Sequence, residues 1–255
     1  MISLERLISL FLDLNMGMVT ALPAVLLVGA LLLGIWVIGM ITPHNGATRT
    51  RRSWGLPLLV GVGASVVMAI PALGAPNWNH GQTIFARYAY WLAIPITFGL
   101  VITIGKLGRR KALFLATFLL VCQVATVSYY GLWGRRAALN YVAFKPFVIP
   151  VMLYHPELYN PLPEIFAERL QGIDTFHPGN MEGSGVYAFP NPEQPTKILV
   201  RSDVIAGEMA TRKAHCPDIA THSVEFGWVY INIAQSCYNH QQASRPATGS
   251  ATRMP

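Results

Sequence analysis

A small set of residues in the first third of the chain could do chemistry: Asp13, Trp78, His80, Arg87 and Tyr88. A carboxylate such as Asp13 can accept a proton from a hydroxyl group. The planar guanidinium of Arg87 suits a phosphate group, and aromatic rings can stack on sugar or lipid. These five residues are therefore the candidate substrate-binding residues, and the sequence assigns no catalytic residue.

Each of these residues also has a structural interpretation. Asp13 could cap a helix, and His80 could be a solvated loop residue. Arg87 could anchor a helix at the level of the lipid headgroups, with its stem along the apolar surface. The chain has no Ser-His-Asp pattern, phosphate loop or HExxH motif. Because no charged residue lies deep within an apolar segment, the sequence does not indicate an ion pathway.

Four long apolar segments must position these residues, and they define the fold class. The first, Met18–Thr42, carries no charge over 25 residues. A helix of that length is about 37 Å long and can cross a hydrocarbon core of about 30 Å. We predict a mainly α, polytopic helical membrane protein with about four transmembrane helices in a domain of residues 17–133. The predicted spans are residues 18–42, 54–72, 88–105 and 112–133.

The net charge of +7 comes from the first half of the chain, since residues 1–133 hold nine Lys/Arg and only two acids, whereas residues 134–255 are neutral. Seven of the nine cations lie in the loops Pro43–Ser53 and Lys106–Lys111. Cytoplasmic loops are enriched in Lys and Arg, so both termini and the loop Leu73–Arg87 should lie outside. We therefore predict an integral protein of the cytoplasmic or inner membrane. Its expected partner is membrane lipid, and nucleic acid is not expected.

Residues 1–16 are too short to span a membrane and favour an interfacial amphipathic helix on the outer surface. A secretory signal peptide is the competing interpretation. The acids Glu5 and Asp13 and the lack of a clear small-x-small cleavage site argue against it. The apolar residues that recur roughly at helical spacing are Ile2, Leu4, Leu7, Ile8, Phe11 and Leu12.

The composition changes after the fourth apolar segment and predicts a small extracytoplasmic α+β domain over residues 134–240. The segment Pro161–Gln171 is typical of a short helix, with a proline near its start and a glycine after it. Lys197–Val200 and Phe226–Ile233 are predicted strands. Residues 241–255 contain too little apolar content to order themselves, so we expect a disordered tail.

Two cysteines in the predicted outer domain, Cys216 and Cys237, could form a disulfide in an oxidising compartment. A zinc site is an alternative, because His215, His222 and His240 lie nearby in the sequence. The spacing of these residues does not match a familiar set of paired zinc ligands. Two unpaired thiols are the third alternative, and no metal ligand is assigned.

Three local patterns carry a resemblance to a known family. The segment FLDLNMG (Phe11–Gly17), just before a spanning helix, resembles the FD-x-x-x-G pattern of integral-membrane glycosyltransferases of the GT-C superfamily. The segment HGQTIFARYAYWLAIP (His80–Pro95) is similar to an outer loop and helix start, "G-RY-x-x-P-x-x-P", in late helices of such proteins. YNPLPEIFAER (Tyr159–Arg169) resembles an extracytoplasmic segment that follows their last helix. The resemblance covers residues 8–175.

The resemblance implies transfer of a sugar from a polyprenyl-phosphate donor to a cell-envelope acceptor at the outer membrane face. Apart from the zinc alternative at the two cysteines, it is also the sole reason to consider a divalent metal, since the residues identify no cofactor. Those enzymes usually have more helices, and the resemblance places their catalytic carboxylate in a first outer loop before the start of this chain. The resemblance therefore implies the C-terminal part of such an enzyme, a split subunit whose partner carries the missing half, or a reduced relative.

A second function class fits the sequence equally well. Four spans with few buried polar groups and a proline-rich outer region are also expected of a non-catalytic membrane scaffold or accessory subunit. Its extracytoplasmic domain would bind a partner protein. The sequence leaves open whether the chain is an enzyme.

Overall fold

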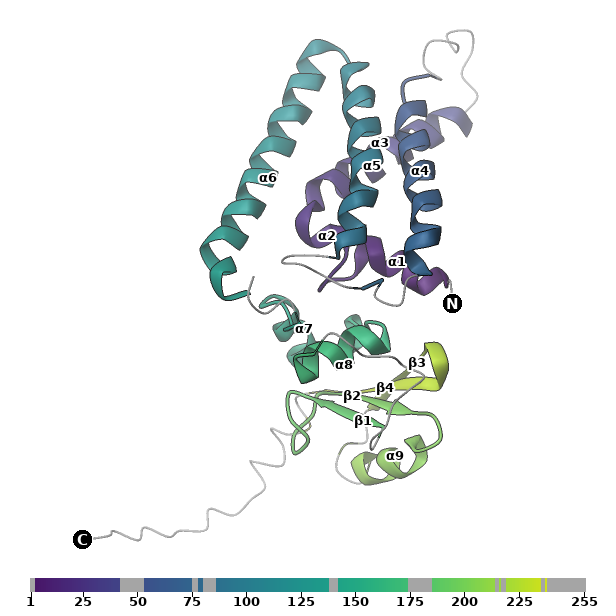
Figure 1. The fold of residues 1–255 in the computed structure, drawn as a ribbon, viewed down its shortest axis with the longest axis vertical. Coiled ribbons are helices and arrows are strands. Elements are labelled where there is room, and N and C mark those ends of the chain that lie inside the picture. Colours follow the sequence, from purple (N-terminus) through teal and green to yellow (C-terminus); the bar gives the residue numbers. More distant parts are fainter. Residues whose placement is uncertain are drawn as a thin grey trace, which may run out of the picture. The chain divides into compact units, whose positions relative to one another are not determined.

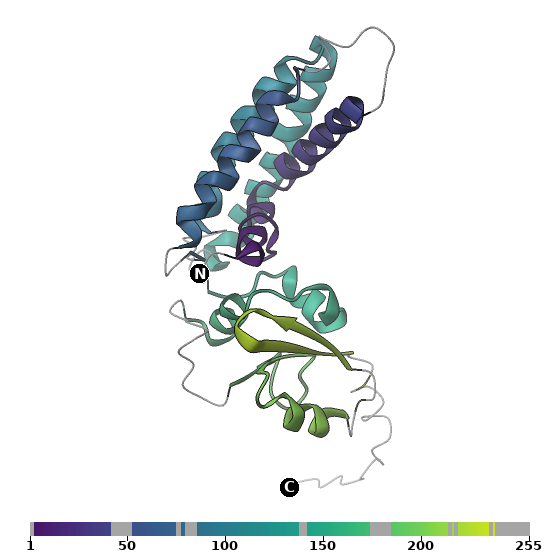
Figure 2. The same cartoon turned by 90° about the vertical axis from the view of Figure 1, so that its right-hand side faces the viewer.

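The computed structural model describes residues 3–41, 53–74, 78–79, 86–137, 142–173, 185–213, 216, 219–234 and 237. Contacts divide the chain into two compact units, Met1–Lys145 and Pro146–Pro255. We call them the helical unit and the sheet unit, and each is described by itself (Figures 1 and 2). The predicted tail 241–255 and the residues His80, His215 and His240 lie outside the described residues.

The helical unit contains four helices that are long and apolar enough to cross a membrane, as the sequence predicts. They are α3, α4, α5 and α6, and two short helices, α1 and α2, precede them (Figure 1). The bounds are α1 Leu4–Leu12, α2 Met18–Ala21, α3 Pro23–Ile41, α4 Leu56–Leu73, α5 Arg87–Gly105 and α6 Arg109–Ala137.

The first predicted span is divided in two, because α2 ends at Ala21 and α3 begins at Pro23. The proline explains the break, since its ring disfavours helical dihedrals at the residue before it. Leu22 accordingly has φ −131° and ψ 48°. The 19 residues of α3 are about 28 Å long, which is still close to the thickness of a hydrocarbon core.

Helices α4 and α5 pack closely through glycines. A Cβ atom at Gly99 would lie 2.5 Å from the carbonyl oxygen of Pro57 on α4, and one at Gly61 would clash with the carbonyl oxygen of Pro95 on α5. Small residues allow apolar helices to approach this closely. The hydroxyl of Ser65 on α4 also donates to the carbonyl oxygen of Leu92, at 2.6 Å.

This packing gives a prediction with a matched control on the same helix. Gly61→Leu should separate α4 from α5 and destabilise the helical unit by about 1–3 kcal/mol, the usual cost of overpacking. Gly63→Leu should be nearly neutral, because nothing lies within 4 Å of a Cβ built there. The measurement is the thermal unfolding temperature of the full-length protein in detergent. Equal temperatures for the two variants would contradict the packing argument.

The sheet unit combines a four-stranded antiparallel sheet, in the order β1-β2-β4-β3, with short helices. The predicted helix and both predicted strands are present, as α8, β2 and β4, whereas β1 and β3 were not predicted. Glycine ends α8 as expected, with Gly172 at φ 69°. The bounds are α7 Val148–Tyr154, η1 Pro156–Leu158, α8 Pro163–Gln171, β1 Val186–Phe189, β2 Lys197–Arg201, α9 Ile205–Lys213, β3 Ile219–Val224, η2 Glu225–Gly227 and β4 Trp228–Ile233.

The two faces of this sheet differ in chemistry. One face is aliphatic and packs against Ile205 and Met209 of α9. On the other face, Tyr230 packs edge-on against Phe166 of α8, with ring centroids 5.3 Å apart. Helices α8 and α9 therefore cover opposite faces of the sheet (Figure 1). The buried aliphatic core consists of Ile198, Val200, Ile231 and Ile233, together with Cys216.

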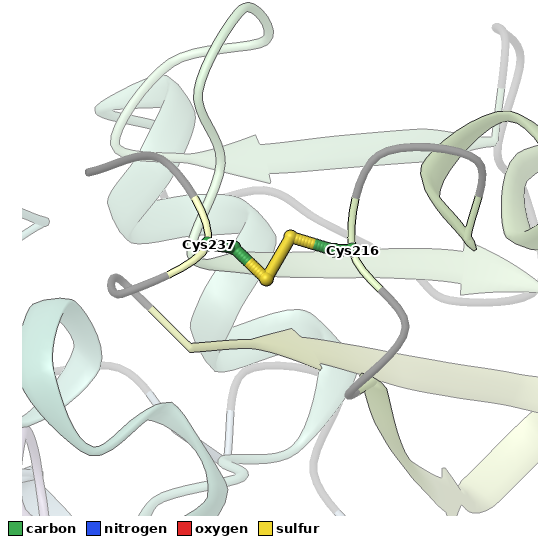
Figure 3. Close-up of a disulfide and its surroundings, with 2 residues drawn as sticks. All are labelled: Cys216 and Cys237. Atoms are coloured by element: carbon green, nitrogen blue, oxygen red, sulfur yellow. A yellow bond between two sulfur atoms is a disulfide. The ribbon is translucent and has the colours of Figure 1, made fainter. Parts of the chain in front are cut away.

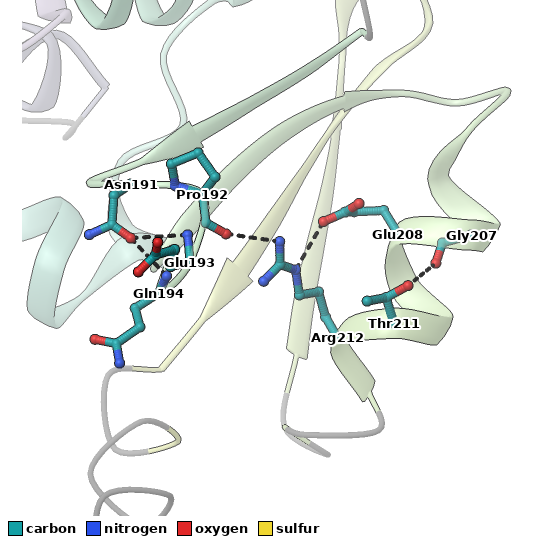
Figure 4. A network of polar contacts seen from close by, with 8 residues as sticks. All are labelled: Asn191, Pro192, Glu193, Gln194, Gly207, Glu208, Thr211 and Arg212. Atoms are coloured by element: carbon teal, nitrogen blue, oxygen red, sulfur yellow. Dashed lines mark hydrogen bonds and ion pairs between the residues drawn. The ribbon is translucent and has the colours of Figure 1, made fainter.

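Polar contacts fix the loop between β1 and β2 onto α9 (Figure 4). The side-chain oxygen of Asn191 accepts from the backbone N–H groups of Glu193 and Gln194, at 3.1 and 2.8 Å, which shapes the turn. The guanidinium of Arg212 donates to the carbonyl oxygen of Pro192 at 3.2 Å and to the carboxylate of Glu208 at 2.9 Å. The loop is therefore held by one helical arginine.

Cys216 and Cys237 form a disulfide, the first of the three alternatives (Figure 3). Both residues belong to the aliphatic core, where Cys216 is 2% exposed. Because the two sulfurs are bonded to each other, neither is available as a thiolate, so the zinc alternative built on these cysteines is wrong. The bridge joins the end of the α9 segment to the segment after β4.

The disulfide closes a loop with a sequence separation of 21 residues, which should contribute about 3 kcal/mol by the chain-entropy model. Cys237→Ser should therefore lower the urea midpoint at which the sheet unit becomes protease-sensitive. Cys122→Ser is the matched control, because Cys122 is a free cysteine. The readout is pulse proteolysis of the full-length protein, followed by mass spectrometry of β2 and β4 peptides. A midpoint for Cys237→Ser equal to that of Cys122→Ser would overturn the assignment.

Candidate functional site

The first candidate site of the helical unit is built on the turn that follows α1. Asp13 is 6% exposed, and its carboxylate accepts from the backbone N–H groups of Asn15 and Met16, at 2.8 and 2.9 Å. The N–H of Gly17 donates to the carbonyl oxygen of Asp13 at 2.8 Å. A Cβ at Gly17 would lie 2.8 Å from the carbonyl oxygen of Ser9. Asp13 and Gly17 therefore act together to reverse the chain between α1 and α2.

This turn lies against the start of α5. The backbone N–H of Ala86 donates to the carbonyl oxygen of Met16 at 2.8 Å, across 70 residues of sequence. The side-chain oxygen of Asn15 accepts from the N–H of Lys145 at 3.0 Å, so the last residue of the helical unit is held at the same place. The turn thus gathers α1, α5 and the segment after α6.

The end of α6 is attached to the same region. The hydroxyl of Tyr130 donates to the carbonyl oxygen of Thr20 at 2.9 Å, and the side chain of Gln123 donates to the carbonyl oxygen of Ala21 at 3.3 Å. Both acceptors are in α2. The helix is broken at Pro23, so the carbonyl groups of α2 can accept from these side chains. This adds a second long helix, α6, to the cluster.

Trp78 forms a buried layer with α1. Its side chain is 2% exposed, and the guanidinium carbon of Arg6 lies 5.4 Å from the centre of its ring. Arg6 itself is 8% exposed. A cation over the face of tryptophan is attracted by the ring quadrupole, most strongly where water is excluded. The pair holds residue 78 against the inner face of α1.

Arg87 and Tyr88 are half-buried residues in the first turn of α5. The guanidinium carbon of Arg87 lies 5.3 Å from the centre of the Tyr88 ring. That ring is in turn edge-on to Trp91, at 6.5 Å. A cation beside two partly open aromatic rings can bind a phosphate and pack against a flat apolar surface.

The outer face of α1 carries an apolar stripe. Leu4, Ile8 and Leu12 are 69%, 47% and 57% exposed, and their spacing places them along one side of the helix. Glu5 is exposed beside this stripe, whereas Arg6 lies on the buried side. An exposed apolar stripe next to a charged residue fits a helix at a lipid–water interface.

A second candidate site lies in the sheet unit, on the face of the sheet that α8 covers. Lys197 on β2 is 0% exposed. Its ammonium donates to the side-chain oxygen of Asn160, at 2.7 Å, and to that of Asn232. It also lies 4.5 Å from the centre of the Tyr230 ring. Lys197 and Asn232 are cross-strand partners in the register of β2 and β4. These contacts satisfy a buried ammonium with neutral groups.

Burial lowers the pKa of Lys197 from its ordinary value of 10.5 to about 7, although the nearby carboxylate of Glu157 acts in the opposite direction. A neutral amine near pH 7 can serve as a base or a nucleophile. Since the side chain has no exposed surface, this chemistry is closed to a substrate in the structure as it stands.

The described residues do not form a metal site. Within the described ranges, no three His, Cys, Asp or Glu side chains are close enough together to hold a metal ion. The divalent metal implied by the resemblance therefore has no ligand set among these residues, and no step is assigned to it. His80, a candidate substrate-binding residue, lies outside the described part of the chain.

Sequence reasoning missed Arg6, Asn15 and Lys197. Arg6 offered a signal, because it is the one basic residue within an otherwise amphipathic segment. Lys197 and Asn232 are isolated polar residues inside apolar strands, which often marks a buried polar pair. Their pairing depends on register, which sequence periodicity alone does not give.

Comparison of the chain with known proteins finds no match, whether to a protein-family model, to a curated protein or to a solved structure. The resemblance to GT-C glycosyltransferases therefore remains a prediction from the sequence.

The buried lysine predicts how the stability of the sheet unit varies with pH. Since the folded-state pKa of Lys197 is about 7, the unfolded chain binds more protons between about pH 7 and 10, and stability should rise with pH there. Lys197→Met should abolish this rise, whereas Lys213→Met, at the end of α9, should keep it. The readout is the urea midpoint of the full-length protein by pulse proteolysis at pH 7 and about pH 9.5. An equal slope in Lys197→Met and Lys213→Met would show that another group is responsible.

Proposed function

We propose that this chain is a membrane glycosyltransferase-like protein that acts on a lipid-linked sugar at the outer face of a membrane. The observation that carries the proposal is the hydrogen bond between the carbonyl oxygen of Met16 and the N–H of Ala86. It brings together two of the three segments on which the resemblance rests, Phe11–Gly17 and His80–Pro95. Segments that meet in space support a common site better than their order in sequence does.

Within this proposal, Arg87 binds the phosphate that joins the sugar to its lipid. Tyr88 and Trp91 pack against the sugar or the first part of the lipid. Asp13 and Trp78 are buried and already have partners in the protein, so we give them the role of holding α1 and α5 in place. The base that accepts a proton from the acceptor hydroxyl is not assigned to a described residue.

The exposed apolar side of α1 supports the same location. A lipid-linked donor reaches an enzyme from within the bilayer, so its phosphate lies near the headgroups. Leu4, Ile8 and Leu12 would place α1 at that depth. Arg87 follows Ala86, which is tied to the turn after α1. The positive-inside rule places this end of the helices outside, opposite Lys106–Lys111.

The scaffold alternative has one observation in its favour. From residue 109 to residue 129, α6 has no buried residue in the described structure. Leu113, Phe114 and Leu120 are 67%, 71% and 65% exposed. A spanning helix with so little contact inside its own chain leaves room for a helix of another subunit. Lipid would cover the same side chains in an enzyme.

The decisive experiment uses the phosphate. Arg87→Ala should weaken binding of a short-chain polyprenyl phosphate to the full-length protein in micelles by about 10- to 100-fold, because a charge-assisted contact is lost. Binding of the corresponding polyprenol, which lacks the phosphate, should not change. The measurement is native mass spectrometry across a lipid titration.

Two further variants complete the test. Arg87→Lys keeps the charge but loses the planar fork, so its affinity should lie between those of the parent and Arg87→Ala. Lys213→Ala, in the sheet unit, should bind as the parent does. If the parent protein binds polyprenyl phosphate and polyprenol equally well, the glycosyltransferase proposal is wrong and the scaffold alternative is favoured.

A further inference from the structure

A cluster of exposed cations lies at the other end of the helical unit, where α5 is joined to α6. Arg109, Arg110 and Lys111 occupy the first turn of α6, and all three are exposed. Their side chains make no hydrogen bond or ion pair with any described residue. Lys106, at the end of α5, differs because its ammonium donates to the carbonyl oxygen of Ser53 at 3.2 Å. Three consecutive cationic side chains are therefore available to interact with a group outside the described part of the chain.

The protein has almost no carboxylates with which to balance them. Between Asp13 and Glu157 the sequence contains no Asp or Glu. The two acids of the helical unit, Glu5 and Asp13, lie on α1 or at its end. That end also holds the start of α5, whereas the three cations follow the end of α5 (Figure 1). The counter-charge for this cluster must come from outside the helical unit.

Helix stability does not account for the cations either. The first turn of a helix is the positive end of its dipole, where Lys and Arg are unfavourable. A basic residue is favoured at the opposite end, where Lys106 lies beside the last turn of α5. Arg109, Arg110 and Lys111 are thus placed against the local electrostatics of their own helix, and a favourable external contact would offset that placement.

We propose that Arg109, Arg110 and Lys111 form a binding site for the headgroups of anionic phospholipids. The two helices that meet here, α5 and α6, are both long and apolar enough to cross a membrane. Side chains at their joined end therefore lie at the depth of the headgroups. Basic residues next to a membrane-spanning helix are attracted to anionic lipid, and three of them together give a preference on the order of 100-fold over neutral lipid.

The test compares lipids that differ in headgroup charge. Full-length protein in mixed micelles is titrated with phosphatidylglycerol or phosphatidylcholine, and bound lipids are counted by native mass spectrometry. We expect the parent to prefer phosphatidylglycerol and the triple variant R109Q/R110Q/K111Q to lose at least tenfold of that preference. The use of micelles removes any effect of these charges on the direction of membrane insertion.

Controls separate charge, location and fold. R109K/R110K keeps all three charges and should retain the preference, while R201Q/K213Q removes two cations from the sheet unit and should also retain it. Unchanged preference in the triple variant, with its unfolding temperature equal to that of the parent, would overturn the proposal. Displacement of the lipid by soluble glycerol phosphate at equal concentration would also overturn it, since the site would then bind a free phosphate. These outcomes do not depend on Arg87, so this proposal can fail or hold independently of the proposed function.

Discussion

The turn from Asp13 to Gly17 is the constraint on which the helical unit depends. The carboxylate of Asp13 accepts from the backbone N–H groups of Asn15 and Met16, which follow the end of α1. The carbonyl oxygen of Met16 accepts from Ala86 at the start of α5, and the side-chain oxygen of Asn15 accepts from Lys145. Buried backbone groups need such partners, so one short turn sets the positions of α1, α2, α5 and the end of the unit.

The sheet unit follows a different logic, because its two faces use different kinds of interaction. The face toward α9 is aliphatic, so its packing is non-directional, and a covalent disulfide closes it. The other face encloses Lys197, whose ammonium requires the amide oxygens of Asn160 and Asn232 in fixed places. A buried ammonium with few acceptors tolerates little change in register, which links the position of Asn160, after η1, to the pairing of β2 and β4.

The sequence was sufficient to predict the four long helices, because an uncharged apolar segment long enough to cross a bilayer seldom folds as anything but a long apolar helix. It also predicted α8, β2 and β4 from caps and strand composition. The division of the first span at Leu22 follows from Pro23. It was not predicted, because the apolar pattern continues without interruption across the break. The candidate site was predicted as residue types. The contact between Met16 and Ala86 spans 70 residues, and no local pattern encodes such a long-range pair. Arg6 and Lys197 were missed because their partners are also distant in the sequence.

The long stretch without acids between Asp13 and Glu157 has a consequence for how the molecule responds to proton concentration. From residue 14 to residue 145, just two histidines, His44 and His80, have ordinary pKa values between about 5 and 8. Arginine and lysine side chains ordinarily stay charged throughout that range. The helical unit therefore behaves as a nearly constant electrical charge fixed in space. Acidification would change the charge of the sheet unit, which holds the remaining ten carboxylates and five histidines, far more than the charge of the helical unit.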